Sequence, residues 1–193
     1  VSWIPRRFYR SKRGLDTAGI AIGGLWVVMG LAQPMTVVVA WFVLFAHLVG
    51  FGGHAWRRHR QGDRDILLKW LVHFRRAFWA VLVSAPIVVY TFLAFNSDPF
   101  LKTWTSQNLI LSPQPLHYLV AYGFLFPFVI LGARRLLATQ PRFAWLPVAW
   151  ALSLPLLAYA PYNLQRRLPE GIWVAFVVLA MSVFDRGGKK SAL

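Results

Sequence analysis

The sequence predicts an all-α integral membrane protein, a bundle of about six transmembrane helices with both termini in the cytoplasm and one cytoplasmic interfacial helix. Three observations predict it: the apolar composition, apolar runs of membrane-spanning length, and basic residues confined to one side. Hydrophobic residues make up 58% of the 193 and charged residues only 14%, with a mean hydropathy of +0.51. A soluble domain of this size has no core that would hide so much apolar surface.

The apolar runs define the predicted spans, because a helix needs about 20 mostly apolar residues to cross the hydrocarbon layer. They cover residues 15–32, 35–52, 77–95, 116–133, 143–162 and 169–184. Only Gln33 and Pro34 separate the first two, which predicts a helical hairpin. Prolines inside the later runs are compatible with a bundle, where neighbouring helices satisfy the freed carbonyls. Gly23-Gly24 in the first span allows close helix packing, although this pair is not a GxxxG pattern.

The basic residues fix the orientation. Of the 21 lysines and arginines, all but Lys102, Arg166 and Arg167 fall on one side of this arrangement, in residues 1–13, 57–76, 134–142 and 186–190. The positive-inside rule then places both termini in the cytoplasm, with the protein in the plasma membrane. The net charge of +15 is explained by contact with anionic membrane lipids, without nucleic acid as a partner. A cleaved signal peptide at the N-terminus is rejected, because its loss would reverse the second span.

On the cytoplasmic side, residues 64–76 carry apolar side chains at helical spacing. This pattern predicts an amphipathic helix that lies on the inner leaflet and orients the bundle. His47 lies inside the second span, where ionisable groups are functional candidates. It has no partner at metal-ligand spacing, so a hydrogen-bonded packing histidine is the favoured interpretation. No metal site is predicted, and the absence of cysteine excludes thiolate chemistry.

The longest outer segment, residues 96–116, is rich in Asn, Gln, Ser, Thr, Trp and Pro. Asn, Asp and aromatic side chains suit the hydroxyls and ring faces of a carbohydrate, but they also suit turns. We take Asp98, Asn108 and His117 as candidate substrate contacts in and beside this segment.

The outer segment PYNLQRRLPEG, Pro161 to Gly171, carries the sharpest local signal. Arg166 and Arg167 contradict the charge rule at a point where two apolar runs nearly meet, so a compensating contact is expected. One interpretation is an anion site, since guanidinium groups bind phosphate oxygens bidentately. The other is pairing with Glu170, Asp98 or lipid phosphates. Both stay open at this point.

No GxSxG, P-loop, Rossmann or CxxC motif is present, and no cofactor is predicted. The segments NSDPFLKTWTSQNLILSPQPLHYLVAYG (Asn96 to Gly123) and PYNLQRRLPEG resemble uncharacterised bacterial multi-span proteins, which are similar to the GT-C superfamily of membrane glycosyltransferases. This resemblance implies transfer of a sugar, of the hexosyltransferase type, from a polyprenyl-phosphate donor on the extracytoplasmic face. It implies Arg166, Arg167 and Gln165 as ligands of the donor phosphate, supported by Tyr162 and Asn163.

That family carries its catalytic acid in the first outer loop, which here is only Gln33-Pro34. The catalytic residue is therefore unknown. The acid-free loop and the initial Val1 predict a fragment that lacks its N-terminal half and is inactive alone. The alternatives are a transporter or flippase of lipid-linked or small solutes, in which proline-kinked helices are common, and a structural membrane subunit.

Overall fold

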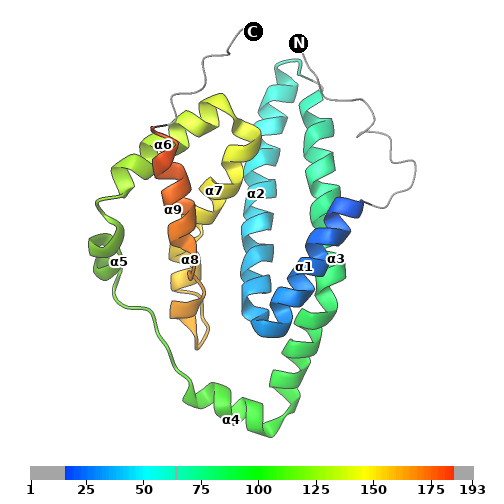
Figure 1. The fold of residues 1–193 in the computed structure, drawn as a ribbon, viewed down its shortest axis with the longest axis vertical. Helices are drawn as coiled ribbons and strands as arrows, with labels where there is room; N and C mark the ends of the chain where they lie inside the picture. The colour runs from blue at the N-terminus through cyan, green and yellow to red at the C-terminus, as the bar shows by residue number, and fades with distance from the viewer. Residues whose placement is uncertain (1–15, 64, 185–193) are drawn as a thin grey trace.

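The computed structural model describes residues 16–63 and 65–184, and the regular structure in this part of the chain is entirely helical (Figure 1). The helices are α1 (Thr17–Ala32), α2 (Pro34–Arg60), α3 (Asp65–Ser97), α4 (Pro99–Gln107), α5 (Pro115–Tyr122), α6 (Phe126–Thr139), α7 (Pro141–Leu152), α8 (Leu154–Ala158), the 3-10 turn η2 (Gln165–Arg167) and α9 (Ile172–Met181). The all-helical class is confirmed.

Among the described residues, α2 and α3 are long and apolar enough to cross a membrane. The pair α5 and α6, bent by 75°, adds a third crossing if it forms one span. Two, or at most three, of the expected spanning helices are therefore present in the described part of the chain, and the total of six stays a prediction.

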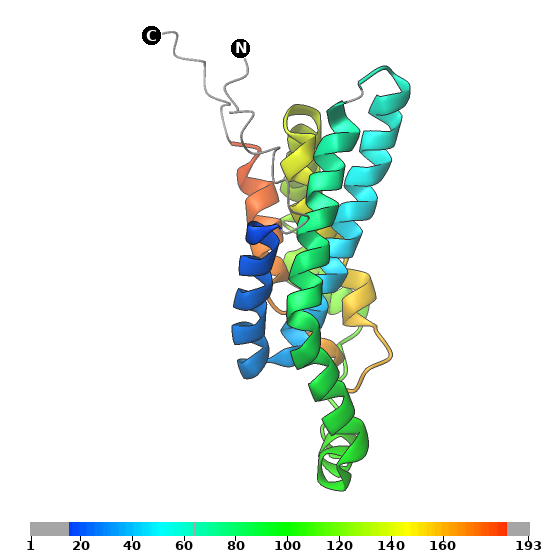
Figure 2. The same cartoon turned by 90° about the vertical axis from the view of Figure 1, so that its right-hand side faces the viewer.

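The first half of the chain forms three long helices, with α3 between α1 and α2 (Figure 2). Gly19, Gly23 and Gly30 of α1 are buried against α3. A Cβ atom on Gly23 would lie 2.6 Å from the Cβ of Val83, so only glycine permits this approach. Gly19 and Gly23 themselves form a GxxxG pattern, which corrects our emphasis on Gly23-Gly24: Gly24 faces open space.

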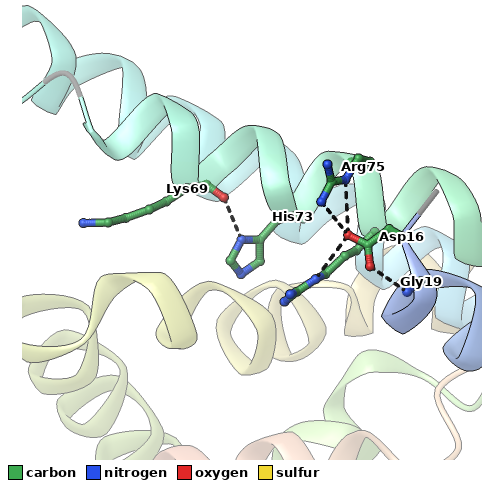
Figure 3. Close-up of polar contacts among 6 residues, drawn as sticks. Asp16, Gly19, Lys69, His73 and Arg75 are labelled. Carbon is green, nitrogen blue, oxygen red and sulfur yellow. Dashed lines mark hydrogen bonds and ion pairs between the residues drawn. The ribbon is translucent and has the colours of Figure 1, made fainter. Parts of the chain in front are cut away.

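The N-terminus of α1 is fixed to α3 by a buried carboxylate. Asp16 is 6% exposed and caps the helix by accepting a hydrogen bond of 3.1 Å from the Gly19 amide. The same carboxylate pairs with Arg75 at 3.2 Å and with Arg76 at 3.5 Å (Figure 3). Cap and ion pairs together anchor α1 beside the first turns of α3.

Residues from Asp65 are helical, as the amphipathic pattern over 64–76 predicts, but they do not end as a separate element, and their place on the inner leaflet stays a prediction. Residues from Asp65 onward run without a break into the apolar segment, as one helix that ends at Ser97. No glycine or proline interrupts the chain before Pro86, so nothing ends the helix at the membrane boundary. Part of the apolar stripe packs on α2 rather than on lipid: Ile66 is buried and the Trp70 indole donates a hydrogen bond to the Leu48 carbonyl. Residue 64 lies outside the described part.

The second half is made of short helices. The run 116–133 divides into α5 and α6 because Pro127 stands at the start of α6, where its ring excludes helical placement of the Gly123 carbonyl. The run 143–162 divides into α7 and α8 for the same reason at Pro155. The last run contains only the 10-residue α9, which follows Gly171 at φ 83°.

The halves meet through α2 and α7, where the Trp145 ring lies directly over Gly50. Figure 1 shows the α2–α3 and α6–α7 links at one end of the molecule, and the α1–α2 turn, α4 and the α8–α9 loop at the other. We call the first the basic end, because Arg57, Arg58, Arg60, Arg134, Arg135 and Arg142 lie in or beside its links. We call the second the cavity end.

Candidate functional site

A cavity of about 1030 Å³ lies at the cavity end, enclosed by the α1–α2 turn, the last turns of α3, α4 and the segment 162–171. Its walls are mainly apolar, with Val38 from α2, Phe92 and Phe95 from α3 and Leu164 from the α8–α9 loop. Segments more than a hundred residues apart in sequence thus form one amphipathic chamber, large enough for a lipid headgroup and part of its chain.

Three charged side chains line this cavity: Lys102 from α4, Arg167 from η2 and Glu170 from the turn before α9. Within the described residues, none of them forms an ion pair or a side-chain hydrogen bond. Their charges are therefore free to meet a ligand, and the two cations next to apolar walls favour an anionic group that carries a hydrocarbon chain.

Aromatic and polar groups complete the lining. Trp104 of α4 is 41% exposed and packs edge-on against Phe95, with ring centroids 6.0 Å apart. Tyr162 and Asn163 also face the chamber. The Tyr162 phenol can donate or accept a hydrogen bond there.

The segment 108–113, which we call the strap, is tied to the α8–α9 loop by hydrogen bonds. The Ile110 amide donates to the Asn163 carbonyl at 2.7 Å, and the Arg166 amide donates to the Ile110 carbonyl at 3.2 Å. The Ser112 amide donates to Oε1 of Gln165 at 3.3 Å. The Asn163 side chain donates to the Thr105 carbonyl at 2.9 Å. These bonds hold the loop, and with it Arg167, against α4.

The structure separates the predicted site residues into groups. Arg167, Tyr162 and Asn163 line the cavity, whereas Arg166 is not among its lining residues and Gln165 holds the strap. Pairing of the arginine side chains with Glu170 or Asp98, the alternative from sequence, is not found among the described residues.

The remaining candidates have local partners or lie elsewhere. Asp98 caps α4 by accepting from the amides of Phe100 and Leu101 at 2.7 and 3.1 Å. Asn108 donates to the Trp104 carbonyl at 2.7 Å at the end of the same helix. His117 is exposed on α5 and does not line the cavity.

Sequence reasoning did not select Lys102, Trp104 and Glu170. The signal for Lys102 was available, because it is the third outer cation and contradicts the charge rule as Arg166 and Arg167 do. Among the described residues, no group of three or more His, Asp and Glu side chains is arranged to hold a metal ion. Comparison with protein-family models, curated proteins and solved structures finds no match to this chain, so its function is inferred from the residues and their geometry.

Proposed function

We propose that this chain is the downstream transmembrane part of a GT-C-like membrane glycosyltransferase and binds a polyprenyl-phosphate-linked sugar in the cavity between its halves. The observation that supports it is the convergence of Lys102 and Arg167, both without ion-pair partners in the described part, among apolar walls. Few ligands other than a lipid-linked anion use both features at once.

Each part of the cavity has a role in this proposal. Arg167 holds two phosphate oxygens through its planar fork and Lys102 neutralises further charge. The side chains of Phe92, Val38 and their neighbours receive the first part of the prenyl chain. Trp104 offers a ring face to a sugar, and Glu170 accepts a hydrogen bond from a sugar hydroxyl.

The proposal includes a topology of about six spans, with the cavity end outside the plasma membrane and both termini in the cytoplasm. Because the chain has no cysteine, single cysteines report on accessibility without background. Gln61→Cys, in the α2–α3 link, is expected to react with an impermeant maleimide only in permeabilised cells. Gln107→Cys, at the end of α4, should react in intact cells. Reaction of both from the same side would exclude this topology.

Two neighbouring arginines test the phosphate site, because Arg167 lines the cavity and Arg166 does not. Arg167→Lys keeps the charge but loses the bidentate fork, so polyprenyl-phosphate binding in detergent should weaken by about tenfold. Arg166→Lys is the matched control and should bind as the wild type does, because Arg166 is not a lining residue. Equal losses in both variants, or none in either, would refute the proposed role of Arg167.

The runner-up is a transporter or flippase of the same lipid-linked class. The broken pair α5–α6, bent by 75°, favours it, since discontinuous helices are common at transporter binding sites. Proteoliposomes discriminate the two: movement of a fluorescent polyprenyl phosphate between leaflets without loss of sugar supports transport. Binding of the polyprenyl phosphate without its movement between leaflets supports the transferase, because this chain alone is expected to transfer no sugar.

A further inference from the structure

A second group of polar side chains lies at the basic end, where α2, α3 and α7 meet around Phe51. The rings of His47 and His73 are 5.7 Å apart, and Phe51 packs on both, at 6.1 Å from His47 and 5.3 Å from His73. Trp145 of α7 packs on the cluster that contains Phe51 and lies over Gly50. Arg142, one turn earlier in α7, acts electrostatically on His73. We call His47, His73, Arg142 and Trp145 the inner junction.

Buried nitrogen atoms of the inner junction have no hydrogen-bond partner. They are Nδ1 of His47, Nε of Arg142 and Nε1 of Trp145, and the His47 side chain is only 5% exposed. The Arg and Trp nitrogens can only donate. Buried donors without acceptors are costly, and such groups in folded proteins commonly mark a bound water or ion.

His73 adds a further donor once its second ring nitrogen is protonated. Nδ1 of His73 lies 2.9 Å from the Lys69 carbonyl, and because a carbonyl only accepts, this nitrogen carries the proton. The Nε2 atom of His73 is then the position that gains a proton when an anion binds beside it. The tautomer is thus fixed by the backbone of α3, and the ring is held in place.

The surroundings of His73 favour negative charge, and no carboxylate among the described residues pairs with the unpartnered donors. The positive charges of Arg142 and Arg76 act on His73 from α7 and α3. The nearby acid Asp16 is already engaged by Arg75, Arg76 and the Gly19 amide (Figure 3). A metal cation would meet this positive field unfavourably, whereas an oxyanion would satisfy the unpaired donors and the charge together.

We propose that the inner junction binds one phosphate group between α2 and α7, with Arg142 and Trp145 donating from one side and His47 and His73 from the other. The group belongs either to an anionic phospholipid of the inner leaflet or to free phosphate. This site is separate from the cavity and does not depend on the proposed function. Because it lies where the two halves meet, its occupancy should also stabilise their contact.

The test uses the full chain, purified and delipidated in detergent, with phosphatidylglycerol and inorganic phosphate as separate probes at matched ionic strength. Binding is followed by native mass spectrometry for the lipid and by thermal shift for both. Arg142→Gln should weaken phosphatidylglycerol binding by about tenfold, as expected for one lost charged contact. Trp145→Phe keeps a six-membered ring for the contact with Gly50, loses the N–H donor with the five-membered ring, and should weaken phosphatidylglycerol binding by a smaller factor, about threefold.

Arg134→Gln is the control, since Arg134 is exposed on α6 at the same end and its loss should leave binding unchanged. A response to the lipid alone identifies a headgroup site, and a response to both probes identifies a free-phosphate site; both support the proposal. Equal weakening in Arg134→Gln and Arg142→Gln would show only diffuse attraction to the basic end and would overturn it. Unchanged phosphatidylglycerol binding in both Trp145→Phe and Arg142→Gln would also overturn the proposal. Arg167→Gln should have no effect here, which keeps this result distinguishable from that of the cavity.

Discussion

The two halves of the chain are similarly apolar but fold differently. Helices α1 to α3 are 16, 27 and 33 residues long, whereas α5, α6, α7, α8 and α9 have 8, 14, 12, 5 and 10 residues. Proline occurs in both halves, but it stands at the breaks of apolar runs only in the second. Pro34 opens α2 at a favourable site and Pro86 lies inside α3 without ending it, whereas Pro127 and Pro155 stand where their runs divide.

This difference has a functional consequence. The long helices provide a regular wall, and the broken helices return the α8–α9 loop to the far end of that wall. The cavity therefore takes apolar side chains from the first half and Arg167 and Glu170 from the second, with Lys102 on the connecting α4. The composition of both halves is compatible with a membrane, and the breaks between the short helices of the second half allow a polar site to form at the cavity end.

The largest expected effect is on the broken half. Gly132→Leu should destabilise it by about 3 kcal/mol, because a Cβ at Gly132 would collide with the Leu179 backbone carbonyl, which cannot rotate away. Hydrogen exchange in detergent should rise in α6 and α9 while α1 to α3 stay protected. Gly24→Leu, at a position with open space around it, should change neither half. Equal loss of protection in both halves would show that they do not unfold separately.

A smaller effect is expected in the long-helix half. Asp16→Ala removes the N-cap of α1 and both arginine contacts, and should cost about 2 kcal/mol, since the arginines are roughly one-third exposed and partly screened. Asp63→Ala, which loses only an exposed contact of 3.9 Å with Arg58, should cost about 0.5 kcal/mol or less. Thermal melting of the two variants side by side measures the difference. Equal melting temperatures would show that the Asp16 contacts stabilise the fold no more than the exposed Asp63–Arg58 contact does.

The smallest effect concerns the strap that joins the halves at the cavity end. Asn163→Ala loses the side-chain bond to the Thr105 carbonyl and should cost about 1 kcal/mol. Exchange of the Ile110 amide, whose acceptor is the Asn163 carbonyl, should become faster. Ser106→Ala, whose hydroxyl bonds only within α4, is the control. Unchanged exchange at Ile110 would mean that the backbone bonds hold the strap without this side chain.

Sequence reasoning was most successful where local rules decide. The all-helical class, the hairpin at Gln33-Pro34 and the apolar membrane helices follow from composition and spacing. The amphipathic pattern over 64–76 did not reveal that the helix continues to Ser97, and Gly19 was overlooked as the partner of Gly23. Arg167 was selected through its violation of the charge rule. Lys102 was not, although it violates the same rule, and neither was Glu170, since only tertiary packing brings its turn beside α4.

We propose that polyprenyl phosphate binds in the cavity and not at the basic end. A photoactivatable polyprenyl-phosphate analogue, cross-linked to the purified chain and mapped by peptide mass spectrometry, tests it directly. We expect cross-links in α4 and in residues 162–171. Excess unlabelled polyprenyl phosphate should prevent these cross-links, and Arg167→Gln should reduce them. Cross-links confined to the α2–α3 and α6–α7 links would contradict this proposal.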